Sequence, residues 1–119
     1  MTYDEASRDF NERFDETRLE IEGTPDGARV RIAGWLGLEE AGRLQALMDT
    51  IMDSVEPGGT ISLDLGEVRY ISSTGVGLLS HALIKARGKG LRFVLSRVSD
   101  TAERVLRLLG LLSFFPAEE

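Results

Sequence analysis

The sequence predicts a small α/β protein in which helices pack on one mixed β-sheet. Three observations point to this class. Two runs of alternating apolar and polar residues flank a Pro-Asp-Gly turn, strand-like and helix-like patterns then alternate along the chain, and 42% of the 119 residues are hydrophobic. The expected order is β-β-α-β-α-β-α. A hairpin followed by strand–helix–strand crossovers combines antiparallel and parallel pairing in one sheet.

The hairpin is expected to begin the domain. Apolar and polar residues alternate at Leu19–Glu22 and again at Ala28–Ala33, with the period of a half-buried strand. Between these runs, Thr24–Gly27 supplies the Pro, Asp and Gly that tight turns favour. These residues predict two antiparallel strands at the start of a domain over residues 17–119.

Residues 1–16 are expected to form an acidic N-terminal extension. Tyr3, Ala6, Phe10 and Phe14 recur at helical spacing, which predicts a short amphipathic helix. The aromatic residues argue against plain disorder. They favour docking of this segment, either on the domain or on a second copy in a homodimer.

A first helix of the domain is expected over residues 38–55. Glu39 and Glu40 lie near its start, where the helix dipole favours negative charge, and Pro57-Gly58-Gly59 ends it. Apolar residues recur every three or four positions and predict one buried stripe: Ala41, Leu44, Leu47, Met48, Ile51 and Val55.

The second half of the chain repeats the alternation of strand and helix. A third strand is expected at Thr60–Leu65, followed by a turn that leads through Val68, Tyr70 and Ile71 to the next helix. That helix begins around Ser72–Gly75 and stops at Gly88–Gly90. A fourth strand follows at 91–95. Asp100 and Glu103 then have the spacing of a capping box, which predicts a last helix with Gly110 just past its end.

Composition limits the classes of function. The net charge of −6 and the pI of about 4.8 argue against binding nucleic acid, which requires a basic surface. The absence of a long apolar run and of a signal peptide, together with an acidic N-terminus and no cysteine, indicates a cytoplasmic protein without direct membrane insertion. Residues 85–107 are rich in Lys and Arg. They form either a solvated face or a cationic surface for an acidic partner or for the acidic extension.

Three consecutive hydroxyl residues, Ser72, Ser73 and Thr74, are the most informative feature. They stand where a strand gives way to a helix, and the free N–H groups of a helix N-terminus accept either a capping oxygen or an anion. One cap requires one hydroxyl, whereas this segment has three. Gly75 and Gly77 follow them and permit close approach of another backbone or molecule.

Catalysis, cofactors and metals find little support. Ser73 lacks the preceding glycine of a nucleophile elbow, and His81 lies eight residues further along the same helix, about 12 Å away. The Gly75–Gly77 pair lacks the rest of a nucleotide-binding motif. One histidine, no cysteine and scattered carboxylates predict no metal site. Asp64 is either a functional acid or, as we favour, a strand-end residue that hydrogen-bonds the turn.

The stretch Ile61–Leu79 resembles the signature of STAS domains, the family found in anti-sigma factor antagonists. An apolar strand with Asp64 is followed by a short turn, a Ser-Ser-Thr-Gly run where the family has Asp-Ser-Ser-Gly, and a helix. The hairpin, Gly34 and the tail through Gly110 to Pro116 fit too, so the resemblance covers about residues 17–117.

The resemblance implies a phosphorylation-dependent switch in protein binding. In such antagonists the first Ser of the motif is phosphorylated by a partner anti-sigma factor that is also a serine kinase. The unphosphorylated domain binds that factor and frees the sigma factor. The matching residue is Ser73, with Thr74 and Ser72 as alternative sites. Partner binding would then involve Ser72–Val76, that is, the three hydroxyl residues with Gly75 and Val76.

Two departures from the family pattern leave other functions open. Ser72 replaces the family's Asp, and Trp35-Leu36-Gly37 replaces an acidic stretch, which predicts altered kinase recognition or no phosphorylation. The alternatives are a constitutive subunit of a sensory scaffold or a membrane lipid-transport complex, and a small-ligand binder at the hydroxyl turn. Trp35 itself either contacts a partner or packs over the first helix.

Overall fold

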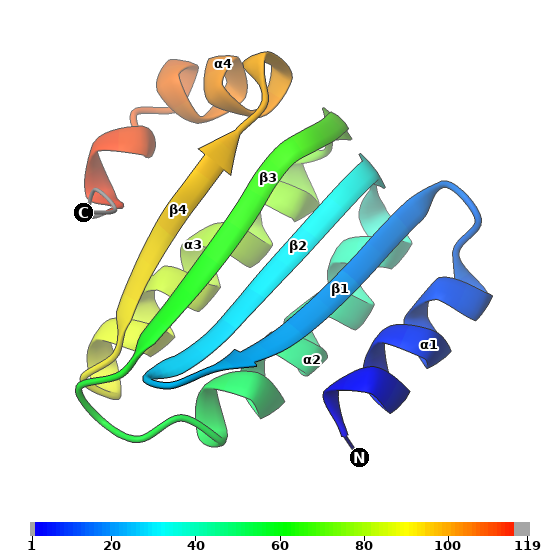
Figure 1. Ribbon diagram of the computed structural model, residues 1–119. Helices are drawn as coiled ribbons and strands as arrows, with labels where there is room; N and C mark the ends of the chain where they lie inside the picture. Colours follow the sequence, from blue (N-terminus) through cyan, green and yellow to red (C-terminus); the bar gives the residue numbers. More distant parts are fainter. Residues whose placement is uncertain (1, 116–119) are drawn as a thin grey trace.

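A four-stranded sheet with helices on one face, along one edge and at one end makes up the molecule (Figure 1). This computed structural model describes residues 2–115. Pro116 and the end of the domain expected at residue 119 lie outside the described residues. The elements are α1 (Tyr3–Arg13), β1 (Thr17–Thr24), β2 (Gly27–Leu36), α2 (Leu38–Asp53), β3 (Thr60–Ile71), α3 (Ser73–Gly88), β4 (Arg92–Val98), α4 (Asp100–Leu108) and the 3-10 turn η1 (Leu112–Phe114).

The sheet is mixed, as the sequence predicts. Its strand order is β1-β2-β3-β4, with β1 antiparallel to β2 and with β2, β3 and β4 parallel to one another. The carboxyl ends of the three parallel strands therefore meet at one end of the sheet. Helices α2, α3 and α4 all begin there, directly after β2, β3 and β4.

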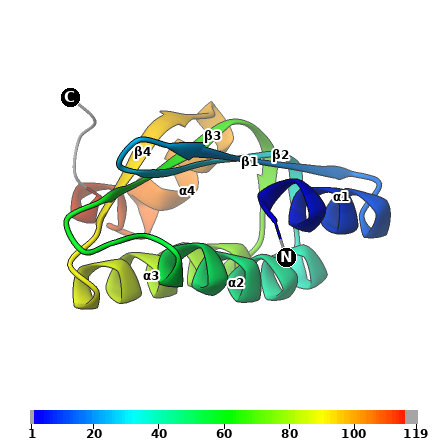
Figure 2. The same cartoon turned by 60° about the horizontal axis from the view of Figure 1, so that its bottom comes forward.

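The core lies between the sheet and the pair α2 and α3, which run side by side on one of its faces (Figure 2). The predicted apolar stripe of α2 is confirmed at Ala41, Leu44, Met48 and Ile51, which are all buried, whereas Leu47 and Val55 are half-buried. Helix α2 ends at Asp53, two residues earlier than expected. The strands contribute alternate residues to the same core: Leu19, Ile21, Val30, Ile32, Ile61 and Leu63.

Strand β3 is longer than the sequence predicts. A turn was expected after Leu65, but pairing with β2 continues to Ile71 through register shifts. Asp64 lies at one such irregularity: its Oδ1 accepts a hydrogen bond from the backbone N–H of Gly66 at 2.8 Å. Beyond this irregularity, Val68 and Ile71 are buried in the core. Burial of these two apolar side chains favours a strand over the expected turn.

The N-cap of α4 also differs from the prediction. Ser99, rather than Asp100, has the extended cap conformation, and its hydroxyl accepts from the N–H of Ala102 at 3.1 Å. Asp100 is the first helical residue, where its charge still complements the helix dipole. At the other end, Gly110 has a φ of 69° just past the C-cap, as expected of a C′ glycine.

The N-terminal extension forms helix α1, which lies along the free edge of β1 (Figure 1). Phe10 is fully buried in the common core. The side-chain amide of Asn11 donates to Leu19 O at 3.0 Å and accepts from Leu19 N at 2.8 Å, as a neighbouring strand would. Asp9 pairs with Arg43 of α2 at 2.9 Å. Within residues 2–115, no helix has the length and apolar character needed to cross a lipid bilayer.

Candidate functional site

The carboxyl ends of β2 and β3 bring the candidate residues of the sequence together. Trp35 is near the end of β2, and Tyr70 is near the end of β3. Ser72 joins β3 to α3, whose first residue is Ser73. Loops at the carboxyl ends of parallel strands are where α/β proteins commonly place ligand and partner sites. We call the exposed side chains here the strand-end surface; its members are Trp35, Leu38, Tyr70, Ser73 and Thr74.

Ser72 is the N-cap of α3. Its backbone is extended, its N–H donates to Leu36 O at 2.9 Å, and its Oγ accepts from the N–H of Gly75 at 3.0 Å. The hydrogen bond to Leu36 fixes Ser72 against the neighbouring strand end. Of the three hydroxyls, that of Ser72 therefore accepts the hydrogen bond from a free N–H group at the start of α3.

Ser73 and Thr74 are the first two residues of α3, and both are exposed. Neither hydroxyl has a hydrogen-bond partner among residues 2–115. The Ser73 side chain thus stands in solvent at a helix N-terminus, where the backbone dipoles favour a negative charge. It is accessible to a modifying enzyme without any rearrangement of the fold.

Gly75 and Val76, both expected to contact a partner, are buried. A Cβ on Gly75 would lie 2.9 Å from Ile71 Cγ1 and 3.1 Å from both Cγ and O of Leu36. The lack of a side chain lets α3 start in contact with the ends of β2 and β3. These two residues hold the helix against the sheet, and the exposed residues before them form the surface.

Trp35 is 44% exposed, and its indole stacks on the ring of Tyr70, with 4.1 Å between ring centroids and 21° between planes. The backbone N–H of Trp35 donates to Glu16 O at 3.0 Å. Its Nε1 lies 3.0 Å from where a Cβ on Gly37 would be, so the indole also covers the start of α2. The expected packing of Trp35 over the first turn of α2 is therefore confirmed, and contact with a partner through its exposed side stays a prediction.

Sequence reasoning missed Tyr70 and Leu38 as surface residues. Tyr70 was assigned to a turn, whereas it is the register partner of Trp35 on the neighbouring strand. Leu38, at the first turn of α2, is 69% exposed. In the sequence, Leu38 directly follows the Gly37 cap and does not belong to the apolar stripe of α2. That position was the only sequence feature that could have identified Leu38 as a surface residue.

Several other charged residues considered in the sequence analysis lie away from the strand-end surface and already have hydrogen-bond or ion-pair partners. Asp64 accepts from Arg97 Nε at 3.0 Å as well as from Gly66, which supports the strand-end interpretation. His81 lies 3.5 Å from Asp49, between α3 and α2. In the cationic run, Lys85 and Lys89 also pair with carboxylates of α2. Among residues 2–115, no three His, Asp or Glu side chains gather as metal ligands.

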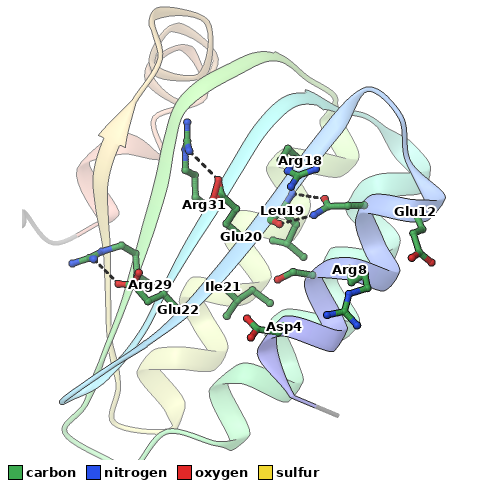
Figure 3. Close-up of a pocket in the computed structure, with 12 residues that line it drawn as sticks. Asp4, Arg8, Glu12, Arg18, Leu19, Glu20, Ile21, Glu22, Arg29 and Arg31 are labelled. Carbon is green, nitrogen blue, oxygen red and sulfur yellow. Dashed lines mark hydrogen bonds and ion pairs between the residues drawn. The ribbon is translucent and has the colours of Figure 1, made fainter.

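A hollow lies between α1 and β1 and extends over the open face of the sheet (Figure 3). Four of its charged residues pair across the hairpin: Arg31 with Glu20 at 2.9 Å and Arg29 with Glu22 at 3.0 Å. These four charges neutralise one another, whereas the strand-end surface carries the exposed apolar side chains of Trp35, Leu38 and Tyr70, so we place the candidate site at the strand-end surface.

Comparison with known proteins gives the same picture of the fold. A family model described as "Mlab, STAS domain" matches residues 19–114. The anti-sigma factor antagonist SpoIIAA in its unphosphorylated form has a similar structure, with a TM-score of 0.71, 20% identity, and coverage of 85% of this chain and 88% of that chain. For the phosphorylated form of SpoIIAA from Bacillus the corresponding values are 0.67, 21%, 85% and 91%.

An anti-sigma factor antagonist from Mycobacterium paratuberculosis is similar to the same degree. Its TM-score is 0.70 at 22% identity, with 87% of this chain and 86% of that chain covered. Likeness at these identities establishes the α/β architecture.

Proposed function

The chain belongs to the STAS domain family, and from this premise we propose that it is a regulatory protein-binding domain whose partner binding is switched by phosphorylation of Ser73. The proposed partner is an anti-sigma factor with serine kinase activity, in keeping with the names of its structural relatives. The domain acts by binding and not by catalysis. The strand-end surface is the contact region.

The observation that carries this proposal is the division of roles between Ser72 and Ser73. Ser72 Oγ caps α3, so Ser73 Oγ remains exposed and without a partner in the described residues. A phosphoryl group on Ser73 would leave the cap in place. The fold would therefore persist in both states, as a reversible switch requires.

The modification is a phosphoryl transfer from ATP held by the kinase partner. Ser73 Oγ forms a bond to the γ-phosphorus as the bond from that phosphorus to the ADP oxygen breaks. The hydroxyl proton passes to a base of the kinase. The product carries about −1.5 to −2 charges at neutral pH, at a helix N-terminus that tolerates them.

The same charge changes how the strand-end surface binds. Trp35, Leu38 and Tyr70 are exposed apolar groups, of the kind that anchor protein interfaces. A phosphate beside them would have to lose water on association, and it would repel an acidic partner surface. Phosphorylation is therefore expected to weaken binding without unfolding either protein.

The test is a capture experiment from lysate of the source cells. Wild type, Ser73→Ala and Ser73→Glu serve as baits, and Ser113→Glu in η1 provides the same added charge on an exposed residue of another element. Wild type, Ser73→Ala and Ser113→Glu are expected to retain a kinase-type anti-sigma factor that Ser73→Glu loses. Incubation of wild type with that factor and ATP is expected to phosphorylate Ser73.

Equal capture by all four baits, with no phosphate on Ser72, Ser73 or Thr74, would contradict the switch. If the captured proteins were subunits of a lipid-transport complex or a sensory scaffold, the domain would be a constitutive subunit. Loss of binding by Ser73→Ala as well would show that the hydroxyl itself makes the contact.

A further inference from the structure

A groove beside Trp35 is walled by the loop that joins α1 to β1. We call it the Trp35 groove; its lining residues are Arg13, Phe14, Asp15, Glu16, Thr17, Trp35 and Glu40. Five of these seven residues belong to the end of α1, the loop and the start of β1. All five precede residue 19, where the match to the family model begins. Four of them, residues 13–16, belong to the N-terminal extension, which therefore builds a large part of this surface.

The loop and the indole are bound to each other, which gives the groove a fixed shape. Trp35 N donates to Glu16 O at 3.0 Å, and the hydroxyl of Thr17 donates to Trp35 O. Tyr70 covers one side of the indole. Because Trp35 is held through its backbone and through its ring, it loses little side-chain freedom when a partner binds.

The groove is acidic. Three carboxylates line it, those of Asp15, Glu16 and Glu40, against one guanidinium, that of Arg13. Arg13 is already paired with Asp9, with 3.2 Å between Nε and Oδ2. No cation of residues 2–115 lies within ion-pair distance of Asp15 or Glu16, and both residues are exposed. Arg18 and Arg69 line an adjoining hollow, which shares residues 14–17 with the groove, and neither forms an ion pair with Asp15 or Glu16.

We propose that the Trp35 groove binds an arginine side chain of the partner protein. A guanidinium is planar, stacks on aromatic faces and donates two parallel hydrogen bonds to a carboxylate. The groove offers an exposed indole beside carboxylates that have no cation of their own. The proposal rests on the protein-binding function above and names the chemistry that this part of the surface recognises.

Arginine fits the groove better than lysine does. The ammonium of lysine is compact and strongly hydrated, and it cannot stack on the indole as a plane. A partner segment with arginine is therefore expected to bind more tightly than one with lysine at the same net charge. A segment in which citrulline replaces arginine keeps the shape and loses the charge.

The chain provides its own reporter, because Trp35 is its only tryptophan. The probe is the peptide acetyl-Gly-Arg-Gly-Leu-Arg-Gly-amide, titrated to millimolar concentration into the full-length protein labelled with ¹⁵N. The shift of the indole N–H resonance and the change in tryptophan fluorescence measure binding. Matched peptides carry lysine or citrulline at both arginine positions.

The arginine peptide is expected to give a saturable shift of the indole resonance, with the lysine peptide weaker and the citrulline peptide weaker by about tenfold. The double variant Asp15→Asn/Glu16→Gln is expected to weaken arginine binding by about three- to tenfold. Asp26→Asn/Glu56→Gln removes two exposed carboxylates at the opposite end of the strands and should leave binding unchanged.

Three results would overturn the proposal: no saturable shift, equal binding of the citrulline peptide, or equal loss in the two double variants. The peptide titration does not involve Ser73 or a kinase, so it fails independently of the proposed switch. Arginine binding without any effect of Ser73→Glu on partner capture would leave the groove standing and reject the switch. Loss of partner capture in Ser73→Glu without any arginine binding would support the switch and reject the proposed role of the groove.

Discussion

Trp35 and Tyr70 stack on each other at the ends of two neighbouring parallel strands, and both rings face solvent. They are register partners on β2 and β3, brought opposite each other just after a register shift between Gly34 and Trp35. An aromatic pair on neighbouring strands supports both rings, so the exposed side of the stack is rigid. The stack therefore gives the strand-end surface two aromatic side chains that are held in a fixed orientation.

Removing the support of the stack should loosen Trp35. Tyr70→Ala is expected to cost about 1 kcal/mol of stability and to change the near-UV circular dichroism and the emission of the single tryptophan. The same variant should weaken partner capture. Tyr70→Phe keeps the ring and should retain the wild-type spectra. Unchanged tryptophan signals in Tyr70→Ala would mean that the stack does not form in solution.

The two serines at the start of α3 should differ in what they contribute to stability. Ser72→Ala removes the cap on Gly75 N and is expected to lower the free energy of unfolding by about 1 kcal/mol. Ser73→Ala removes an exposed hydroxyl that has no partner in the described residues, so its effect should stay within about 0.5 kcal/mol. Urea denaturation of both variants measures the difference. Equal losses would contradict the assignment of the cap.

Which hydroxyl caps the helix could not be predicted from sequence. Ser72, Ser73 and Thr74 are locally equivalent, since all three residue types accept a hydrogen bond from a helix N-terminus. The choice is made by a contact between strands, the bond from Ser72 N to Leu36 O. Sequence periodicity does identify the turn as the transition to a helix, because the strand and helix patterns meet there.

Long-range pairing also explains why Tyr70 and β3 were misassigned. Val68, Tyr70 and Ile71 are expected in a turn because the alternation of the strand is interrupted after Leu65. Pairing with β2 resumes beyond the irregularity at Asp64, and only the register of two strands places Tyr70 on Trp35. Local patterns were sufficient for the hairpin and the stripe of α2, which depend on short-range alternation, and the order of these elements then predicted the mixed sheet.

Two glycines of α3 should respond in opposite directions to the same substitution. A Cβ on Gly75 would meet Ile71 and the Leu36 backbone, so Gly75→Ala is expected to destabilise the protein by about 1–3 kcal/mol. No atom lies within 4 Å of a Cβ on Gly77, so Gly77→Ala should stabilise the helix by about 0.5–1 kcal/mol. Thermal unfolding of the pair tests this, and a stabilising Gly75→Ala would show that α3 has room to shift.

Helix α1 should contribute to the stability of the whole domain. Phe10 is fully buried in the core, and Phe10→Ala is expected to lower the free energy of unfolding by about 3 kcal/mol. Glu12→Ala changes an exposed residue of the same helix and should have little effect. Equal stability of the two variants would mean that α1 is detached from the sheet in solution, and the Trp35 groove would lose its wall.

The ion pair between α1 and α2 should appear in the titration of Asp9. Hydrogen bonds from Arg43 first, and from Arg13 second, hold the pKa of the Asp9 carboxyl below its ordinary value. A lowered pKa in the folded state means that the stabilising contribution is complete above the ordinary Asp pKa of about 3.9. It is lost as the pH falls through the lower, folded pKa.

Arg43→Gln removes the larger cause and should raise the pKa of Asp9 towards its ordinary value, as measured by carbon-detected NMR of the carboxyl groups. Asp53 is the matched control, because its pKa is also lowered, chiefly by a hydrogen bond from Lys89, and it should not move in this variant. If the pKa of Asp9 stayed low in Arg43→Gln, the contact between α1 and α2 would not be the cause. Arg13, within α1, would then account for the shift.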